Sequence, residues 1–369
     1  MKTNSLLDKA CMVLSIIVLI AVLSISLIML KSMNPAADEM VFIRVTQQLP
    51  KYDQHVEWWS LMGKTHPVDM PHVDEKYREL YDRTNEHAIR PHPPVASYLM
   101  YPFVKLLYSE ETPEQVLGSV EKLRQIAWAA IAFCMIAAVY ITTRKCKSGI
   151  GALLVTLPLV AILPLFTVFG NNWFYNDTFM LLFLMIALAM RETKYEKFIY
   201  IPLTLMVGSK MYALLFLIPF IIENKKTALC GLVLVPYFIQ CYFATGDFFY
   251  PFTSRISLEE IRAGAVPIDS DFMTKASRMI FNLYRLTWLE MCDIPYFMGI
   301  VTLPFVFLVS KGIKNKNWFL PLLFAISIGV TGLGTVKCLY RLLPAMIIGT
   351  LVIGEAISYW IPNNNVQRR

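Results

Sequence analysis

Apolar runs separated by short polar segments make up most of this chain. The first run, residues 10–30, is about 20 residues long, which is enough to cross a bilayer as a helix. Runs with the same character follow at 126–142, 150–168, 178–190, 227–243, 294–309, 318–330 and 342–360. Helix-length apolar runs of this kind predict an all-α polytopic membrane protein.

The apolar stretch 198–222 allows two interpretations. Lys197 and Lys225 bracket it, and Gly208, Ser209 and Lys210 interrupt its middle. Cytoplasmic loops carry an excess of lysine and arginine, so both ends should be cytoplasmic. We therefore predict two short helices with Lys210 near the outer turn. The alternative is a single long span, which would invert all later segments.

With two helices in that stretch, about ten transmembrane helices place every basic cluster on one side. Both termini are then expected in the cytoplasm. Two segments, 31–108 and 246–287, are expected outside. The first of these segments ends with residues 93–108. This stretch is short for a membrane crossing and suits a helix lying in the membrane interface.

Composition supports the membrane assignment and narrows the chemistry. Of 369 residues, 56% are hydrophobic, and the net charge of +7 comes from short basic clusters between apolar runs. That placement indicates topology and not a nucleic-acid partner. The seven cysteines have no paired spacing, so we expect no disulfide framework. The five histidines, all within 55–92, lack the close spacing of a dedicated histidine metal centre.

Ionisable residues gather at the predicted outer ends of the spans. They are Asp38, Glu39, Asp177, Lys210, Asp247, Lys337 and Arg341. A transporter more often places such groups near mid-bilayer on broken helices, so the pattern favours an extracytoplasmic active site. Asp38 and Glu39 could act as a base or hold a metal ion; alternatively, they only charge and cap the first turn of a helix.

The second outer segment raises a related question about cations. It carries five of them among apolar residues: Arg255, Arg262, Lys275, Arg278 and Arg285. Guanidinium groups match the geometry of phosphate oxygens, so a lipid-linked phosphate is one explanation for cations on this side. A solvated amphipathic helix is the other.

Five short motifs, in order along the chain, resemble those of GT-C class glycosyltransferases that use polyprenyl-phosphate sugars, a group that includes protein O-mannosyltransferases and aminoarabinose transferases. The motifs are Asp38-Glu39, His92-Pro93-Pro94, Gly208-Ser209-Lys210-Met211-Tyr212, Gly246-Asp247-Phe248-Phe249-Tyr250-Pro251 and Tyr340-Arg341-Leu342-Leu343-Pro344. The chain departs from that pattern in the order Tyr340-Arg341 and in having Phe248 where proline is frequent. These departures leave the sugar and the acceptor open.

The resemblance implies a GT-C-like fold with interfacial helices in the first outer loop. It also implies transfer of a sugar from a polyprenyl or dolichyl phosphate to a glycan, lipid or protein acceptor, with inversion. In that reaction Asp38 is the general base and Glu39 its catalytic neighbour. Lys210, Arg255 and Arg341 would bind the donor phosphate, and acceptor or sugar contacts would come from His92, Asp177, Asp247 and Tyr250.

A divalent metal cation is a further implication of the resemblance, with Glu39 and His92 as candidate ligands. The expected location is the plasma membrane, with an extracytoplasmic site. Two other functions remain open. One is a flippase or polymerase-like protein that handles lipid-linked saccharides without transferring monosaccharides, and the other is an assembly subunit with a degenerate site.

Overall fold

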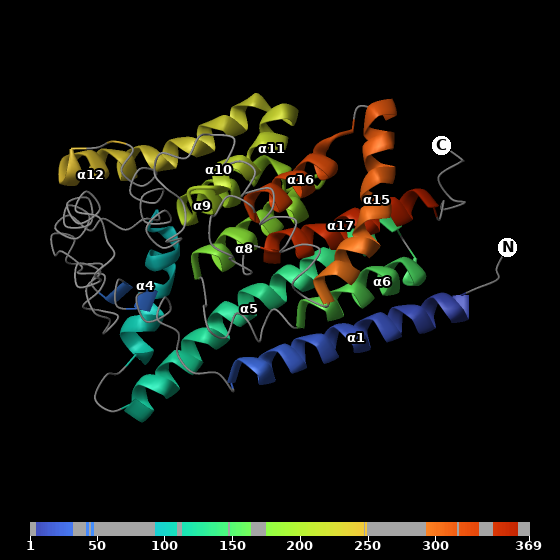
Figure 1. Cartoon of the computed structure of the whole chain (residues 1–369), viewed down its shortest axis with the longest axis horizontal. Helices are drawn as coiled ribbons and strands as arrows, with labels where there is room; N and C mark the ends of the chain where they lie inside the picture. Colours follow the sequence, from blue (N-terminus) through green and yellow to red (C-terminus); the bar gives the residue numbers. More distant parts are fainter. Residues whose placement is uncertain are drawn as a thin grey trace, which may run out of the picture.

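The computed structural model describes residues 5–31, 42–43, 46–47, 93–108, 113–146, 148–163, 175–246, 248, 293–315, 317–331 and 342–360. Within these ranges every regular element is a helix (Figure 1). The prediction of an all-α chain is therefore confirmed for the described residues. Asp38, Glu39, His92, Asp247, Tyr250, Arg255 and Arg341 lie outside them.

The helices follow the predicted apolar runs. In chain order they are α1 (Ser5–Lys31), α4 (Val95–Leu107), α5 (Pro113–Cys146), α6 (Gly149–Thr156), η3 (Leu157–Ile162), α8 (Tyr175–Met190), η4 (Glu196–Phe198), α9 (Tyr200–Ser209), α10 (Ala213–Phe216), α11 (Ile218–Glu223), η5 (Lys225–Leu234), α12 (Val235–Thr245), α15 (Asp293–Asn315), α16 (Phe319–Thr331) and α17 (Leu342–Trp360).

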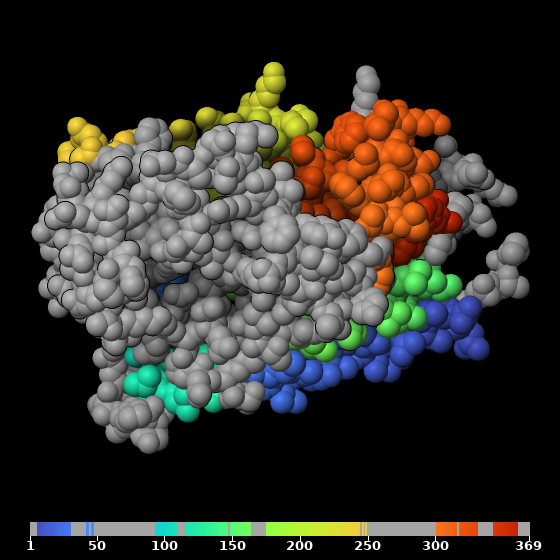
Figure 2. Space-filling view, in the orientation of Figure 1, coloured from blue at the N-terminus to red at the C-terminus, as the bar shows by residue number. Residues whose placement is uncertain are grey.

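Four helical stretches are long and apolar enough to cross a membrane: Leu6–Leu30, Gln115–Cys146, Lys225–Phe243 and Leu342–Trp360. The first leaves most of its leucine and isoleucine side chains at the surface, and Figure 2 shows α1 along one edge of the molecule. A helix that exposes this much apolar surface is expected to face lipid. These helices indicate a membrane protein, whereas ten crossings stay a prediction.

Helix α17 forms the centre of the bundle. Almost all of its residues from Leu342 to Ile357 are buried, and it packs against α5, α6, α15 and α16. Its sequence is apolar on all sides, which is the pattern of a helix surrounded by other helices. In Figure 1 it runs through the middle of the described helices.

Charged residues hold several helix ends together at one end of this bundle. The Nη2 atom of Arg144, at the end of α5, donates to the carbonyl oxygen of Arg191, just after α8, at 3.3 Å. Lys145 pairs with Glu355 of α17 at 2.5 Å. The carboxylate of Asp8 in α1 accepts a hydrogen bond of 2.7 Å from the backbone amide of Gly149, at the start of α6.

We call this the basic end, defined by residues 144–146, 148–149, 191–198, 223–226, 311–315 and 317–319. Nine lysine and arginine residues belong to these segments. Lys311 and Asn315 line the same small cavity as Glu355, so the turn between α15 and α16 also lies here. The gathering of these segments is what a cytoplasmic face requires, although its side of the membrane remains a prediction.

The stretch 198–222 turns back on itself, as predicted. Asn224 donates a hydrogen bond of 2.8 Å from its side chain to the hydroxyl of Tyr200. A continuous helix over that interval would separate the two residues by about 36 Å. The backbone leaves α9 at Lys210, which is extended with φ −152° and ψ 134°. One long span is therefore excluded, and Lys210 lies at the tip of a helical hairpin.

Helix α4 lies at the other end of the bundle, which we call the distal end and define by the starts of α8 and α17, the tip of the hairpin and α4 itself. In Figure 1 it runs across the direction of α1 and α5. It buries Ala96, Met100 and Val104 and exposes Tyr98 and Leu106. A short helix is therefore present where one was predicted over 93–108, and it has one buried and one exposed face.

The second predicted span lies within a longer helix. The apolar run covers 126–142, but α5 begins at Pro113, so Arg124 lies inside the helix and is only 2% exposed. The apolar run marks the most hydrophobic part of α5. The helix extends before it because residues 114–125 contain no proline and are mostly good helix formers, with Gly118 as the exception.

Candidate functional site

A buried ion pair marks the distal end of the bundle. The Nζ atom of Lys210 lies 2.6 Å from Oδ2 of Asp177, and the two side chains are 1% and 4% exposed. Both residues were predicted at outer span ends, Lys210 as a phosphate ligand and Asp177 as an acceptor or sugar ligand. The structure brings these two candidates into direct contact with one another, which the sequence did not predict.

The helices that carry the pair also favour its charges. Asp177 lies in the first turn of α8, and Lys210 directly follows the last residue of α9. Helix dipoles stabilise an anion near the N-terminus of a helix and a cation near the C-terminus. Helices α8 and α9 pack against each other, so the two favourable ends meet at the ion pair.

Polar atoms near the pair still have capacity for a ligand. Oδ1 of Asp177, Oδ1 of Asn176 and the hydroxyl of Tyr212 are buried and have no hydrogen-bond partner within the part of the chain that the structure describes. The ring of Tyr212 lies 5.2 Å from Nζ of Lys210. Buried polar atoms are usually paired, so this group is suited to a partner rich in hydroxyl groups.

Aromatic packing connects the first outer segment to this group. The rings of Phe42 and Tyr175 stack with centroids 4.5 Å apart, and Tyr175 is fully buried two residues before Asp177. Phe42 follows the candidate base Asp38 by four residues, so the chain keeps their Cα atoms within about 14 Å of each other. Phe42 therefore packs against the start of α8, two residues before Asp177.

Close packing connects α4 to the same place. A Cβ atom at Gly208 would lie 2.5 Å from Cγ2 of Val95, so only glycine lets α4 approach α9 this closely. Val95 follows His92 by three residues. Gly208 comes just before Lys210, and α4 also packs on α5 and α8.

Arg124 is the functional candidate that sequence reasoning missed. Helices α5 and α8 pack together, and Arg144 and Arg191 meet at the basic end. At 1.5 Å per residue, Asp177 lies about 21 Å from that end and Arg124 about 30 Å. Arg124 is thus a second fully buried cation toward the distal end. No local signal in the sequence marks the early start of α5. Sequence reasoning therefore could not indicate that Arg124 is buried within this helix.

The last two motifs point to the same end of the bundle. α17 begins at Leu342, directly after Arg341, and its far end carries Glu355 at the basic end. The η5–α12 stretch begins at Lys225 and ends at Gly246, where φ is +73°. Segments flanking all five motifs are therefore placed away from the basic end, while Asp247, Tyr250, Arg255 and Arg341 themselves lie outside the described residues.

The metal candidates Glu39 and His92 also lie outside the described ranges. Within those ranges, no three histidine, cysteine, aspartate or glutamate side chains gather in a metal-binding group. Asp177 is an oxygen ligand in principle, but its Oδ2 is already paired with Lys210.

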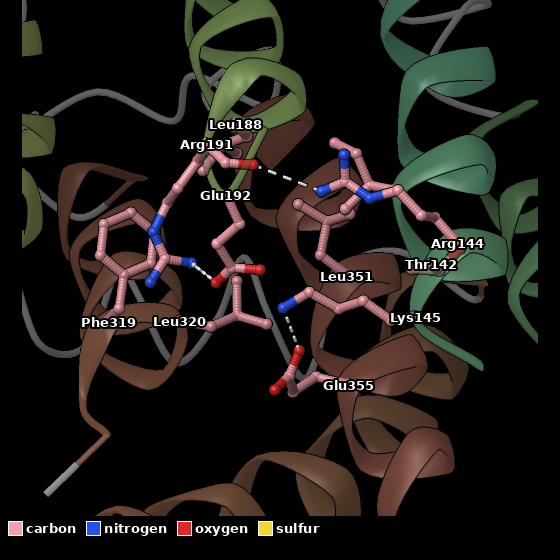
Figure 3. Close-up of a pocket in the computed structure, with 11 residues that line it drawn as sticks. Thr142, Arg144, Lys145, Leu188, Arg191, Glu192, Phe319, Leu320, Leu351 and Glu355 are labelled. Carbon is pink, nitrogen blue, oxygen red and sulfur yellow. Dashed lines mark hydrogen bonds and ion pairs between the residues drawn. The ribbon is translucent and has the colours of Figure 1, made fainter. Parts of the chain in front are cut away.

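Charges at the basic end form a different kind of arrangement (Figure 3). Arg144, Lys145, Arg191 and Glu355 line a cavity of about 30 Å³. That volume holds about one water molecule, and hydrogen bonds and ion pairs already join these side chains. Arg191 also lies 3.9 Å from the ring centre of Phe319. We interpret this group as a set of contacts that holds the helix ends together.

Comparison of the chain with models of protein families, with curated proteins and with solved structures finds no match.

Proposed function

We propose that this chain is an integral-membrane glycosyltransferase of the GT-C type. It transfers a sugar from a polyprenyl or dolichyl phosphate to an acceptor hydroxyl at the distal end of the bundle. The observation that carries the proposal is the buried Asp177–Lys210 pair. Lys210, from one of the five motifs, meets Asp177 there, which the sequence analysis gives as a candidate acceptor or sugar ligand.

Two buried cations support the choice of an anionic donor. Arg124 and Lys210 both lie toward the distal end, and Lys210 is at the tip of the hairpin beside Asp177. Cationic side chains bind phosphate oxygens through charge-assisted hydrogen bonds. In the proposed complex the lipid phosphate lies against Lys210, and its polyprenyl tail remains in the bilayer. Arg255 and Arg341 complete the proposed phosphate ligands.

Each of the remaining candidate residues has a role in the proposed reaction. Asp38 removes the proton from the acceptor hydroxyl, whose oxygen attacks the anomeric carbon from the face opposite the phosphate. The bond between that carbon and the phosphate oxygen breaks, so the configuration inverts and the lipid phosphate leaves with its electron pair. Lys210 stabilises the charge on the departing phosphate. Glu39, His92, Asp177, Asp247 and Tyr250 orient the sugar and the acceptor.

Base assistance of this kind is typically worth about a hundredfold to ten-thousandfold in rate. Positioning of the two substrates adds to it, because the reacting atoms must approach in line. Asp177 has a double role in this proposal. Its Oδ2 holds Lys210, and its buried Oδ1 is available to a sugar hydroxyl.

The depth of Asp177 within the bundle supports a second candidate function. By helix rise, Asp177 lies about 21 Å from the basic end, which is well inside a hydrocarbon core of about 30 Å. Charged groups at such depth also suit a protein that moves or handles a lipid-linked saccharide without cleaving it. A flippase or polymerase-like protein is therefore the alternative.

One experiment separates the two functions. Purified protein in liposomes receives polyprenyl-phosphate sugars labelled in the sugar, together with cell-envelope acceptors. Transfer gives a labelled acceptor and free polyprenyl phosphate, and both should be lost in Asp38→Asn. Movement of intact donor across the bilayer, without free lipid phosphate, would reject the transferase and support the alternative.

A further inference from the structure

A lateral groove beside the basic end is separate from the distal site. It has a volume of about 610 Å³ and lies between the last turns of α5 and α8 and the turn that follows α8. Its lining includes Phe133, Tyr140, Arg144, Met190, Lys194 and Tyr195. The groove is about twenty times larger than the neighbouring 30 Å³ cavity and opens to the outside of the bundle.

Cations and aromatic rings form the rim of this groove at the basic end. Arg144 lies 6.0 Å from the ring centre of Tyr140, and Nζ of Lys194 lies 5.1 Å from that of Tyr195. The acidic residue in the lining, Glu192, is paired with Arg191 at 3.0 Å. Arg144 and Lys194 therefore leave a net positive charge on the rim.

The turn after α8 is built to present this rim. Glu192 adopts a left-handed backbone with φ 60°, which is uncommon for a residue other than glycine. The hydroxyl of Thr193 donates to the carbonyl oxygen of Met190 at 2.6 Å and accepts from the amide of Tyr195 at 3.2 Å. These bonds fix the chain on both sides of Lys194.

An apolar wall runs from the rim along the bundle. Phe133 lies three turns before Arg144 on α5, which corresponds to about 16 Å along the helix. The side chains of Phe133 and Tyr140 are exposed, and Ile186 and Met190 of α8 face the same groove. A charged head beside an apolar strip of this length matches a phospholipid, whose phosphate and acyl chain have the same arrangement.

We propose that this groove binds an anionic phospholipid of the leaflet at the basic end. Arg144 and Lys194 bind its phosphate, and its acyl chain lies along Phe133, Ile186 and Met190. Basic pockets between transmembrane helices on the cytoplasmic side are suited to anionic headgroups, and that leaflet is the negatively charged one. The proposal is independent of the glycosyltransferase activity.

Native mass spectrometry of delipidated protein tests this binding directly, with phosphatidylglycerol or phosphatidylcholine added to the detergent. We expect wild-type protein to retain phosphatidylglycerol and to retain phosphatidylcholine much less. Each cation near the surface should contribute about a fivefold change in affinity, so Arg144→Gln/Lys194→Gln should weaken phosphatidylglycerol binding by about 25-fold.

The matched control is Lys225→Gln/Lys226→Gln, which removes the same charge from the same end but outside the groove. It should bind as wild-type protein does. Lys194→Glu alone, at an exposed lysine, gives a second test in case loss of the Arg144–Arg191 hydrogen bond disturbs folding. Equal binding of the two lipids, or equal effects of the groove and control variants, would overturn the proposal.

Discussion

Lys210 and Asp177 lie 33 residues apart in sequence and form a buried ion pair of 2.6 Å at the meeting point of α8 and α9. The contact joins the tip of a helical hairpin to the first turn of another helix. It explains how a lysine and an aspartate are retained among apolar helices, because each charge compensates the other.

Breaking the ion pair should destabilise the protein strongly. Lys210→Met or Asp177→Asn leaves an uncompensated buried charge or an unmatched cation, which costs about 3–5 kcal/mol. The double variant Asp177→Leu/Lys210→Met removes both charges and should recover most of the loss. Thermal unfolding in detergent measures all three. Equal destabilisation by the double variant and the sum of the single variants would show that the two side chains do not interact.

Glu223→Gln is the control for that experiment. Glu223 pairs with Arg191 in a more exposed setting, where the two side chains are 40% and 19% exposed. Exposed ion pairs contribute about 0–1 kcal/mol, so this change should shift unfolding little. A shift as large as that of Lys210→Met would indicate that burial does not set the strength of these pairs.

The same double variant separates stability from chemistry. If Lys210 binds the donor phosphate, Asp177→Leu/Lys210→Met should fold but transfer sugar at least about a hundredfold more slowly, since a cation that stabilises the departing phosphate is gone. Initial rates at saturating acceptor give this comparison. Near-normal transfer by the folded double variant would show that Lys210 does not bind the donor phosphate and has a purely structural role.

Gly208→Ala should displace α4 from α9. The added Cβ would lie 2.5 Å from Cγ2 of Val95, which is closer than carbon atoms approach without movement. We expect a loss of about 1–3 kcal/mol from overpacking, measured by thermal unfolding. Val95→Ala removes the clashing carbon, so combining the two changes should restore part of the stability. Gly118→Ala is the control, because nothing lies within 4 Å of a Cβ there.

Cysteine labelling checks the hairpin within a membrane. In a background without native cysteines, Thr193→Cys and Lys225→Cys flank the stretch 198–222. Both positions belong to the basic end, so both should react from the cytoplasmic side of intact cells. Reaction of the two cysteines from opposite sides would mean that the stretch crosses the membrane once.

Local patterns in the sequence predicted much of the fold. Apolar length predicted α1 and α17, the basic residues around 198–222 predicted the hairpin, and the short apolar stretch after Pro93 predicted α4. These features depend on neighbouring residues and on the bilayer, both of which are visible in one sequence. The full length of α5 was missed because the helix begins well before its most apolar part. The burial of Arg124 was missed for the same reason.

The site was predicted less completely, for a physical reason. Asp177 and Lys210 could each be placed at the end of a span, but their contact depends on how α8 packs against α9. Likewise, nothing in the sequence around Gly208 indicates that Val95 is its neighbour. Contacts between distant segments follow from tertiary packing, and no local pattern encodes them.

The activity of Asp38→Asn is the most direct test of the proposed reaction. Wild-type and variant proteins are given radiolabelled polyprenyl-phosphate sugars with envelope acceptors, after thermal unfolding has shown that both are equally stable. We predict transfer from one donor by wild-type protein and a loss of about a hundredfold to ten-thousandfold in the variant. Undiminished transfer by Asp38→Asn, or no turnover of any donor by stable wild-type protein, would contradict the proposed glycosyltransferase mechanism.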